Sequence, residues 1–110
     1  MKQSQLRYHH LGIPTTVQRE GEQFLPEYHV YVSGYETSEY AIEWMRYEKE
    51  CGLPEVVKTL PHIAFEVDDI YAAIEGKEVI IQPNSPSEGV TVAFIIEKGA
   101  PIEFIHIEKE

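Results

Sequence analysis

Residues 42–49 read IEWMRYEK and residues 102–109 read IEFIHIEK, so the chain carries one eight-residue segment twice. The two copies are identical at four positions, and two further positions exchange one apolar side chain for another. A weaker echo pairs HLGI at residues 10–13 with HIAF at residues 62–65. Each half of the chain thus supplies a histidine early and a glutamate late. This pattern predicts a duplicated fold whose halves meet at a pseudo-twofold axis.

Length, composition and charge limit the classes of partner. The 110 residues fit a single domain, residues 1–110, and the 43% of hydrophobic residues are enough for a packed core. A net charge of −10 argues against a nucleic-acid partner, which needs a basic face, and against an anionic membrane surface. We therefore expect the partners to be a small-molecule substrate and a second copy of the chain in a homodimer.

The sequence favours the cytoplasm. No apolar run approaches the roughly 18 residues of a membrane span, and the first residues show no secretory signal. The single cysteine, Cys51, cannot form a disulfide within the chain.

Segments rich in β-branched and aromatic residues predict a strand-dominated chain. The expected strands cover residues 6–13, 27–33, 39–48, 61–67, 78–82, 90–97 and 101–107. Turn signals separate several of them, notably PNSP at residues 83–86. Short helices are expected at residues 54–60 and at residues 68–75, the second with an aspartate cap and a glycine stop.

The second half, residues 61–110, therefore reads as a strand, a helix and three strands. The first half, residues 6–49, repeats this order in shortened form. Its residues 14–23 contain Pro, Gly and β-branched residues that make a poor helix, so we expect a loop or a short extended piece there. Residues 50–60 form the link between the halves and contain the first helix.

Strand alternation places the repeated His and Glu side chains on one face, opposite the large apolar side chains. Two His and two Glu are a suitable ligand set for a divalent metal. These candidate ligands are His10, Glu43, His62 and Glu103. The candidate pocket residues on the same face are Tyr8, Gly12, Met45, Tyr47, Ala64, Ile105 and Ile107. A sheet that curls around this face encloses a cavity.

The histidines next to these positions leave one alternative open. His9 precedes His10 and becomes the ligand if the strand register slips by one residue. Strand alternation and the match to His62 favour His10. His106 shares its side of the strand with Phe104, so we expect it to face away from the metal.

At these residues the chain resembles the vicinal oxygen chelate superfamily, which contains the glyoxalases, the extradiol dioxygenases and the bleomycin- and fosfomycin-resistance proteins. PHIAFEVDDI at residues 61–70 resembles the family's opening strand and helix, and HLGI at residues 10–13 resembles the opening of its first module. GAPIEF at residues 99–104 resembles its closing strand. The resemblance implies an α+β fold of two βαβββ-type modules, the first abbreviated, that form an open half-barrel around one divalent metal. The implied ligands are His10, Glu43, His62 and Glu103.

The resemblance also implies a function. The ligand set is similar to that of the glyoxalase I and epimerase branches, which indicates a metal-dependent lyase or isomerase acting on a small oxygenated substrate. The expected metal is Ni, Co, Zn, Mn or Fe, because a mixed N/O ligand set suits all of them. Glu43 or Glu103 is the expected catalytic base, and the symmetry leaves that choice open. The alternative is a small-molecule binding or sequestering protein of the bleomycin-resistance type, without catalysis.

Overall fold

The computed structural model describes residues 6–109. Both ends of the expected domain, residues 1–5 and residue 110, lie outside the described residues. Its strands are β1 (Arg7–Pro14), β2 (Gln23–Leu25), β3 (Val30–Ser33), β4 (Ile42–Tyr47), β5 (His62–Glu66), β6 (Glu78–Ser87), β7 (Val90–Glu97) and β8 (Ala100–Ile107). Its helices are α1 (Glu55–Thr59) and α2 (Ile70–Ile74). No helix among the described residues is long and apolar enough to cross a membrane.

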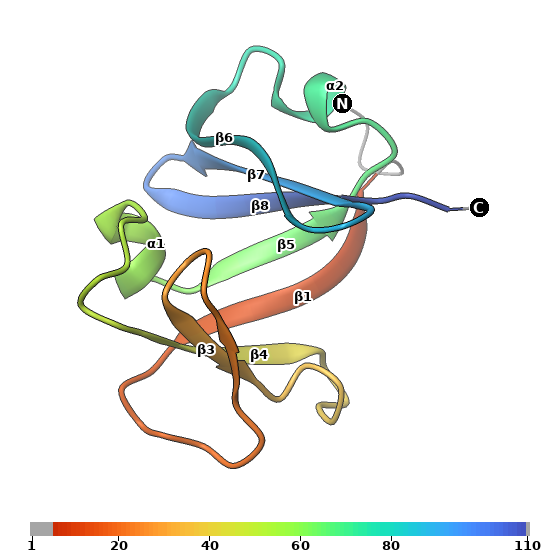
Figure 1. Ribbon diagram of the computed structural model, residues 1–110. Coiled ribbons are helices and arrows are strands. Elements are labelled where there is room, and N and C mark those ends of the chain that lie inside the picture. The colour runs from red at the N-terminus through yellow and green to blue at the C-terminus, as the bar shows by residue number, and fades with distance from the viewer. Residues whose placement is uncertain (1–5, 110) are drawn as a thin grey trace.

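All eight strands form one mixed sheet in the order β2-β3-β4-β1-β5-β8-β7-β6. The first strand of each half pairs in parallel with the last strand of that half, β1 with β4 and β5 with β8. The two halves join through the antiparallel β1–β5 pair, so the strand order is symmetric about that pair. The sheet curls into a half-barrel, as Figure 1 shows. The expected α+β half-barrel is therefore confirmed.

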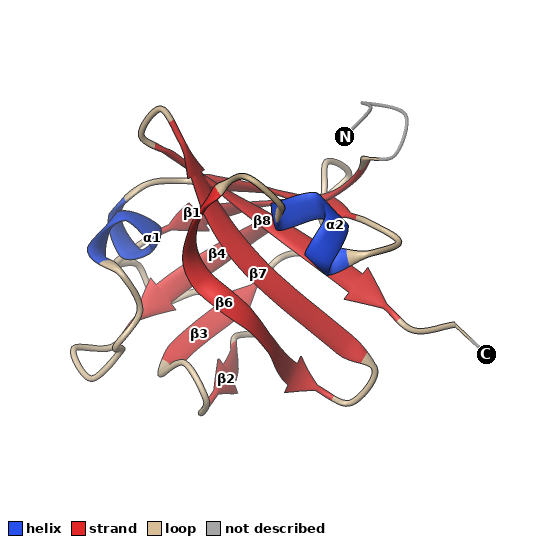
Figure 2. Ribbon diagram, turned by 90° about the horizontal axis from the view of Figure 1, so that it is seen from above, coloured by secondary structure: helices blue, strands red, loops and turns tan. Residues whose placement is uncertain are grey.

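The outer face of the second half is covered by helix α2, which packs against β6, β7 and β8 (Figure 2). The helix begins at Asp69, whose carboxylate accepts hydrogen bonds from the backbone N–H groups of Tyr71 and Ala72. Its buried residues join the core of the outer face. This core consists of Val67, Ile70, Ala73, Ala93, Ile95 and Phe104.

The first half lacks a helix between its first two strands, as its sequence predicts. Residues 15–22 form a loop, and β2 after them is only three residues long. The guanidinium carbon of Arg19 in this loop lies 4.2 Å from the centre of the Trp44 ring. A cation–π contact thus covers apolar surface that a helix covers in the second half.

The PNSP segment corrects one expectation. Residues 83–86 were expected to form a turn after a short strand, whereas β6 continues through them to Ser87. The pairing of β6 with β7 shifts register at three places, two of them within residues 81–87. Because β6 lies at the edge of the sheet, the missing N–H groups of Pro83 and Pro86 are tolerated there. The short strand β2 was also not expected.

The partly exposed apolar side chains on the outer face of the first half lead us to predict a twofold homodimer. Ile13, Ile42 and Trp44 are only partly buried there, and covering apolar surface is worth about 25 cal/mol per Å². Light scattering at micromolar concentration should report a dimer. Ile42→Lys should shift it toward the monomer, while Tyr71→Lys on exposed α2 should not. A wild-type monomer throughout this range would contradict the prediction.

Candidate metal centre

The pairing of the central strands places the four candidate ligands in two neighbouring rows across the sheet. In one row Gly12 on β1 lies between Glu43 on β4 and His62 on β5. In the other row Ala64 on β5 lies between His10 on β1 and Glu103 on β8. Each row therefore has a His at one end, a Glu at the other and a small residue between them. The pseudo-twofold axis exchanges the two rows.

The small residue at position 12 makes room for a ligand. A Cβ atom on Gly12 would lie 2.2 Å from Cε1 of His62, far inside any real contact distance. The imidazole of His62 therefore lies directly over the Gly12 backbone and is only 1% exposed. Glycine is needed here for close approach of a side chain.

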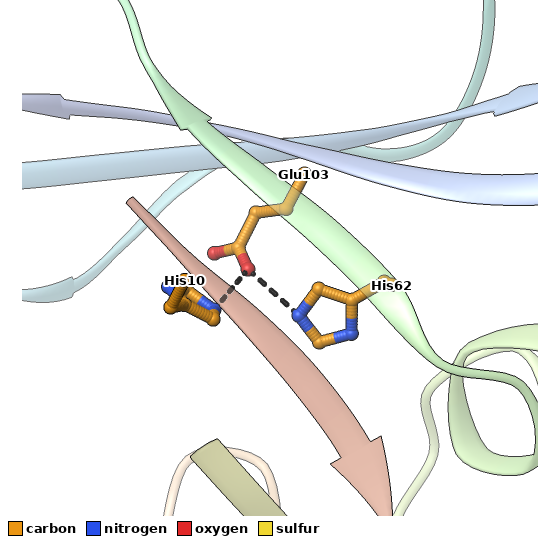
Figure 3. Close-up of side chains that lie close together, drawn as sticks. All are labelled: His10, His62 and Glu103. Carbon is orange, nitrogen blue, oxygen red and sulfur yellow. Dashed lines mark ion pairs between the residues drawn. The ribbon is translucent and has the colours of Figure 1, made fainter. Parts of the chain in front are cut away.

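The structure brings three of the four candidate ligands into contact. Oε1 of Glu103 lies 3.3 Å from Nε2 of His10 and 3.1 Å from Nε2 of His62 (Figure 3). All three residues are buried. The carboxylate thus joins side chains from β1, β5 and β8.

The charges of these groups depend on one another. Burial raises the pKa of Glu103, but the contacts and positive charge of His10 and His62 outweigh it and lower the pKa to about 2. Burial lowers the pKa of His10, but Glu103 and then Glu43 outweigh it, so that this pKa is raised. Without a metal, a proton on the imidazole of His10 is the counter-charge of the carboxylate.

The same three residues fit a divalent metal. One nitrogen of each histidine and one carboxylate oxygen lie within 4.8 Å of one another. Metal–ligand distances of about 2.0–2.2 Å place ligand atoms roughly 3.3–3.6 Å apart in a tetrahedral site, close to the separations of 3.3 and 3.1 Å at Glu103. The 3.1 Å contact of His62 is poorly directed for a hydrogen bond, and both of its buried ring nitrogens lack a partner. A metal ion would supply one. His10, His62 and Glu103 can therefore hold a metal ion.

Glu43 is placed differently from its symmetry mate. Its carboxylate lies 3.6 Å from Nε2 of His10 and its side chain is 22% exposed. Burial is the main cause that raises the pKa of Glu43. The charge of His10 opposes it, the charge of Glu103 adds to it and that of His62 opposes it, so that the pKa stays raised. Glu43 therefore lies beside the three-residue cluster and keeps a carboxylate that faces the cavity.

A β-bulge brings in a residue that alternation had placed elsewhere. The β1–β5 register shifts between Tyr8 and His10, so His9 and His10 both reach the cavity. Their Nδ1 atoms lie 2.8 Å apart, and the ring of Tyr35 stacks on His9. Because one Nδ1 must donate and the other accept, this contact leaves Nε2 of His10 for the metal side. The adjacent histidines were the only sign of this arrangement in the sequence.

A cavity of about 190 Å³ opens above the cluster. His10, Glu43 and Glu103 lie at its polar end, and most of the other lining residues are apolar. Of the expected pocket residues, Met45, Tyr47 and Ile105 line it. The remaining four do not belong to the described lining: Tyr8, Gly12, Ala64 and Ile107.

The structure explains why three of these four residues do not line the cavity. Tyr8 precedes the bulge, and its half-exposed ring donates a hydrogen bond of 2.7 Å to the carbonyl of Tyr40. Gly12 is covered by the ring of His62, and Ala64 is fully buried between the paired ligands. Helix α1 closes one end of the cavity with Val57, a contribution that alternation along strands cannot predict.

Comparison with solved structures shows how widely this fold is shared. A hypothetical protein from Bacillus halodurans C-125 superposes with a TM-score of 0.72 at 22% identity, over 96% of each chain. Methylmalonyl-CoA epimerase from Mycobacterium tuberculosis superposes with a TM-score of 0.56 at 14% identity. That match covers 96% of this chain and 89% of the epimerase. The chain has the fold of these proteins. The sequence matches no protein-family model and no curated protein.

The close approach at Gly12 can be tested by adding one methyl group. Gly12→Ala should push the His62 ring out of place and weaken Zn²⁺ or Co²⁺ binding at least tenfold in calorimetric titration. Gly52→Ala is the matched control, since no atom lies within 4 Å of its added Cβ, and it should bind like wild type. Equal affinities in both variants would show that His62 is not a ligand.

The pKa shifts predict opposite pH trends with and without metal. Because the pKa of His10 is raised in the fold, protonated His10 stabilises the metal-free protein at pH values below the ordinary pKa of 6.5. This stabilisation is lost as the pH rises through the folded-state pKa. Because the pKa of Glu103 is lowered in the fold, ionised Glu103 stabilises the metal-free protein at pH values above 4.5. This stabilisation is lost as the pH falls toward about 2. The metal-free melting temperature should therefore decline above about pH 6.5.

Metal reverses this trend because it competes with the proton for Nε2 of His10. The rise in melting temperature caused by Zn²⁺ should be large at pH 8 and small at pH 5.5. His10→Ala should remove most of it, whereas His106→Ala should not, since His106 pairs with the carbonyl of Val67. A gain that does not change between pH 5.5 and pH 8 would contradict ligation by His10.

Proposed function

We propose that this chain is a glyoxalase-like member of the vicinal oxygen chelate superfamily. It is a metal-dependent lyase or isomerase that acts on a small oxygenated substrate chelated to a divalent ion. The observation that carries the proposal is the buried cluster of His10, His62 and Glu103, of which His10 and Glu103 line the polar end of a mostly apolar cavity. The shared fold of methylmalonyl-CoA epimerase supports an isomerase-like reaction.

The two glutamates have different roles in this proposal. Glu103 contacts both histidines and serves as the carboxylate ligand. Glu43 contacts only His10, at 3.6 Å, and its carboxylate is open to the cavity. It is therefore placed to take a proton from a substrate carbon next to a carbonyl group and to return it to the neighbouring atom. The metal, when bound, supplies Lewis-acid stabilisation of the negative charge on the substrate oxygens.

The walls of the cavity strengthen the interactions at its polar end. They are mostly apolar, and charged groups beside such walls interact more strongly than in solvent. The contact of His9 with Nδ1 of His10 holds the imidazole in one orientation. Both features favour a preorganised site.

One observation favours a second function. The walls beyond the cluster are mostly apolar, which also suits a protein of the bleomycin-resistance type that binds and sequesters small molecules without changing them. The two functions differ in what happens to the bound molecule. Sequestration requires binding alone, whereas the isomerase must exchange a carbon-bound proton.

Proton exchange on 2-hydroxyacetophenone, which carries neighbouring oxygens on an apolar body, separates the roles of the glutamates. In D₂O, the Zn²⁺- or Co²⁺-loaded protein should catalyse the exchange of the CH₂ protons of 2-hydroxyacetophenone for deuterium, as followed by NMR. Glu43→Gln should keep the metal and lose roughly 10²-fold or more of the exchange rate. Glu103→Gln should lose the metal and the exchange together. Binding of the probe without exchange by metal-loaded wild type would favour sequestration.

A further inference from the structure

The wall of the cavity beyond the metal cluster differs from the cluster in chemistry. Val30 on β3, Ile81 on β6, Val92 and Phe94 on β7, and Ile105 on β8 all face into it. They come from both halves of the sheet. A molecule that reaches the metal cluster must therefore lay the rest of its surface against aliphatic and aromatic carbon.

The polar groups of this wall are already paired with one another. The Tyr28 hydroxyl donates to the side-chain carbonyl of Asn84, and the amide nitrogen of Asn84 donates to the carbonyl of Gln82. The Tyr47 hydroxyl points at the sulfur of Met45. These contacts leave few donors or acceptors for the body of a ligand. Recognition of polar atoms is therefore concentrated at the cluster.

Positive charge is missing from the same wall. Among the described residues that line the cavity there is no Lys or Arg, and Glu43 and Glu103 are acidic. Three cationic side chains outside the cavity lining form ion pairs with acidic residues. Arg46 pairs with Glu22 at 2.7 Å, Arg7 with Asp68 at 2.9 Å and Lys58 with Glu55 at 3.0 Å. A substrate whose body carries phosphate groups, such as a coenzyme A thioester, would find no Lys or Arg among the described lining residues to pair with them.

We propose that the substrate is a molecule without anionic groups on its body, in which a compact apolar body of about one substituted ring carries two neighbouring oxygen atoms. The size follows from the cavity of about 190 Å³, since an apolar cavity of about 150 Å³ holds benzene. This inference rests on the proposed function for the oxygen pair. The apolar body rests on the wall alone.

Three hydroxamic acids with the same chelating oxygens and different bodies test the substrate class on Zn²⁺-loaded protein. Calorimetry should show benzohydroxamic acid binding at least tenfold tighter than acetohydroxamic acid, because only the first fills the apolar wall. Phosphonoacetohydroxamic acid, with an anionic body, should bind no tighter than acetohydroxamic acid. Equal affinity of the first two probes, or tightest binding of the phosphonate, would overturn the proposal while leaving the metal site intact.

A metal-free measurement separates this inference from the proposed function. Toluene should shift the methyl resonances of Val90, Val92 and Ile105 in metal-free protein and leave those of Val17, in an exposed loop, unchanged. If the protein binds no metal but toluene shifts the cavity methyl groups, the function falls and the apolar site stands. If toluene shifts none of these methyl resonances, the proposal that the substrate has an apolar body is wrong.

Neighbouring residues on β7 provide a matched pair of variants. Val90 lines the cavity, whereas Thr91 pairs with His106 and does not belong to the described lining. Val90→Asp should remove at least tenfold of the preference for benzohydroxamic over acetohydroxamic acid, and Thr91→Asp should retain it. Using the ratio of two probes cancels any effect on the metal itself. Retention of the full preference in Val90→Asp, with an unchanged melting temperature, would place the phenyl group outside the cavity.

Discussion

The contact of one buried carboxylate with two histidines organises the centre of this molecule. Glu103 comes from the second half of the chain and touches His10 of the first half and His62 of its own half. A buried carboxylate is stable only with cationic or donating partners, so the strands that carry these partners must keep their register. The pairing of β1 with β5 and of β5 with β8 satisfies that requirement. The cavity, in turn, depends on the curl of the sheet around this point.

The duplicated halves have become unequal. Helix α2 covers the second half, whereas a loop with Arg19 over Trp44 covers the first. The inequality extends to the candidate ligands, because Glu103 contacts both histidines and Glu43 lies to one side with access to the cavity. A symmetric pattern of residues thus yields two carboxylates with different surroundings. Different surroundings are what a site needs when one carboxylate binds metal and another moves protons.

A shared fold limits the function less than the lining of the cavity does. The chain superposes with methylmalonyl-CoA epimerase, whose substrate name includes a coenzyme A group. The cavity described here has mostly apolar walls and two acidic groups, and its described lining contains no Lys or Arg. Fold alone does not determine the substrate, because the same half-barrel can present different side chains to the same central site.

The sequence by itself determined the positions of seven of the eight strands, the loop that replaces the first helix, the cap at Asp69 and the common face of the repeated His and Glu residues. Helix capping and the two-residue alternation of a strand are local properties, so they can be read from neighbouring residues. Only the tertiary structure decided that Glu103 rather than Glu43 joins both histidines, that a bulge turns His9 into the cavity, and that β6 continues through PNSP. Register, bulges and edge positions arise from pairing between strands distant in sequence, and no local pattern encodes them.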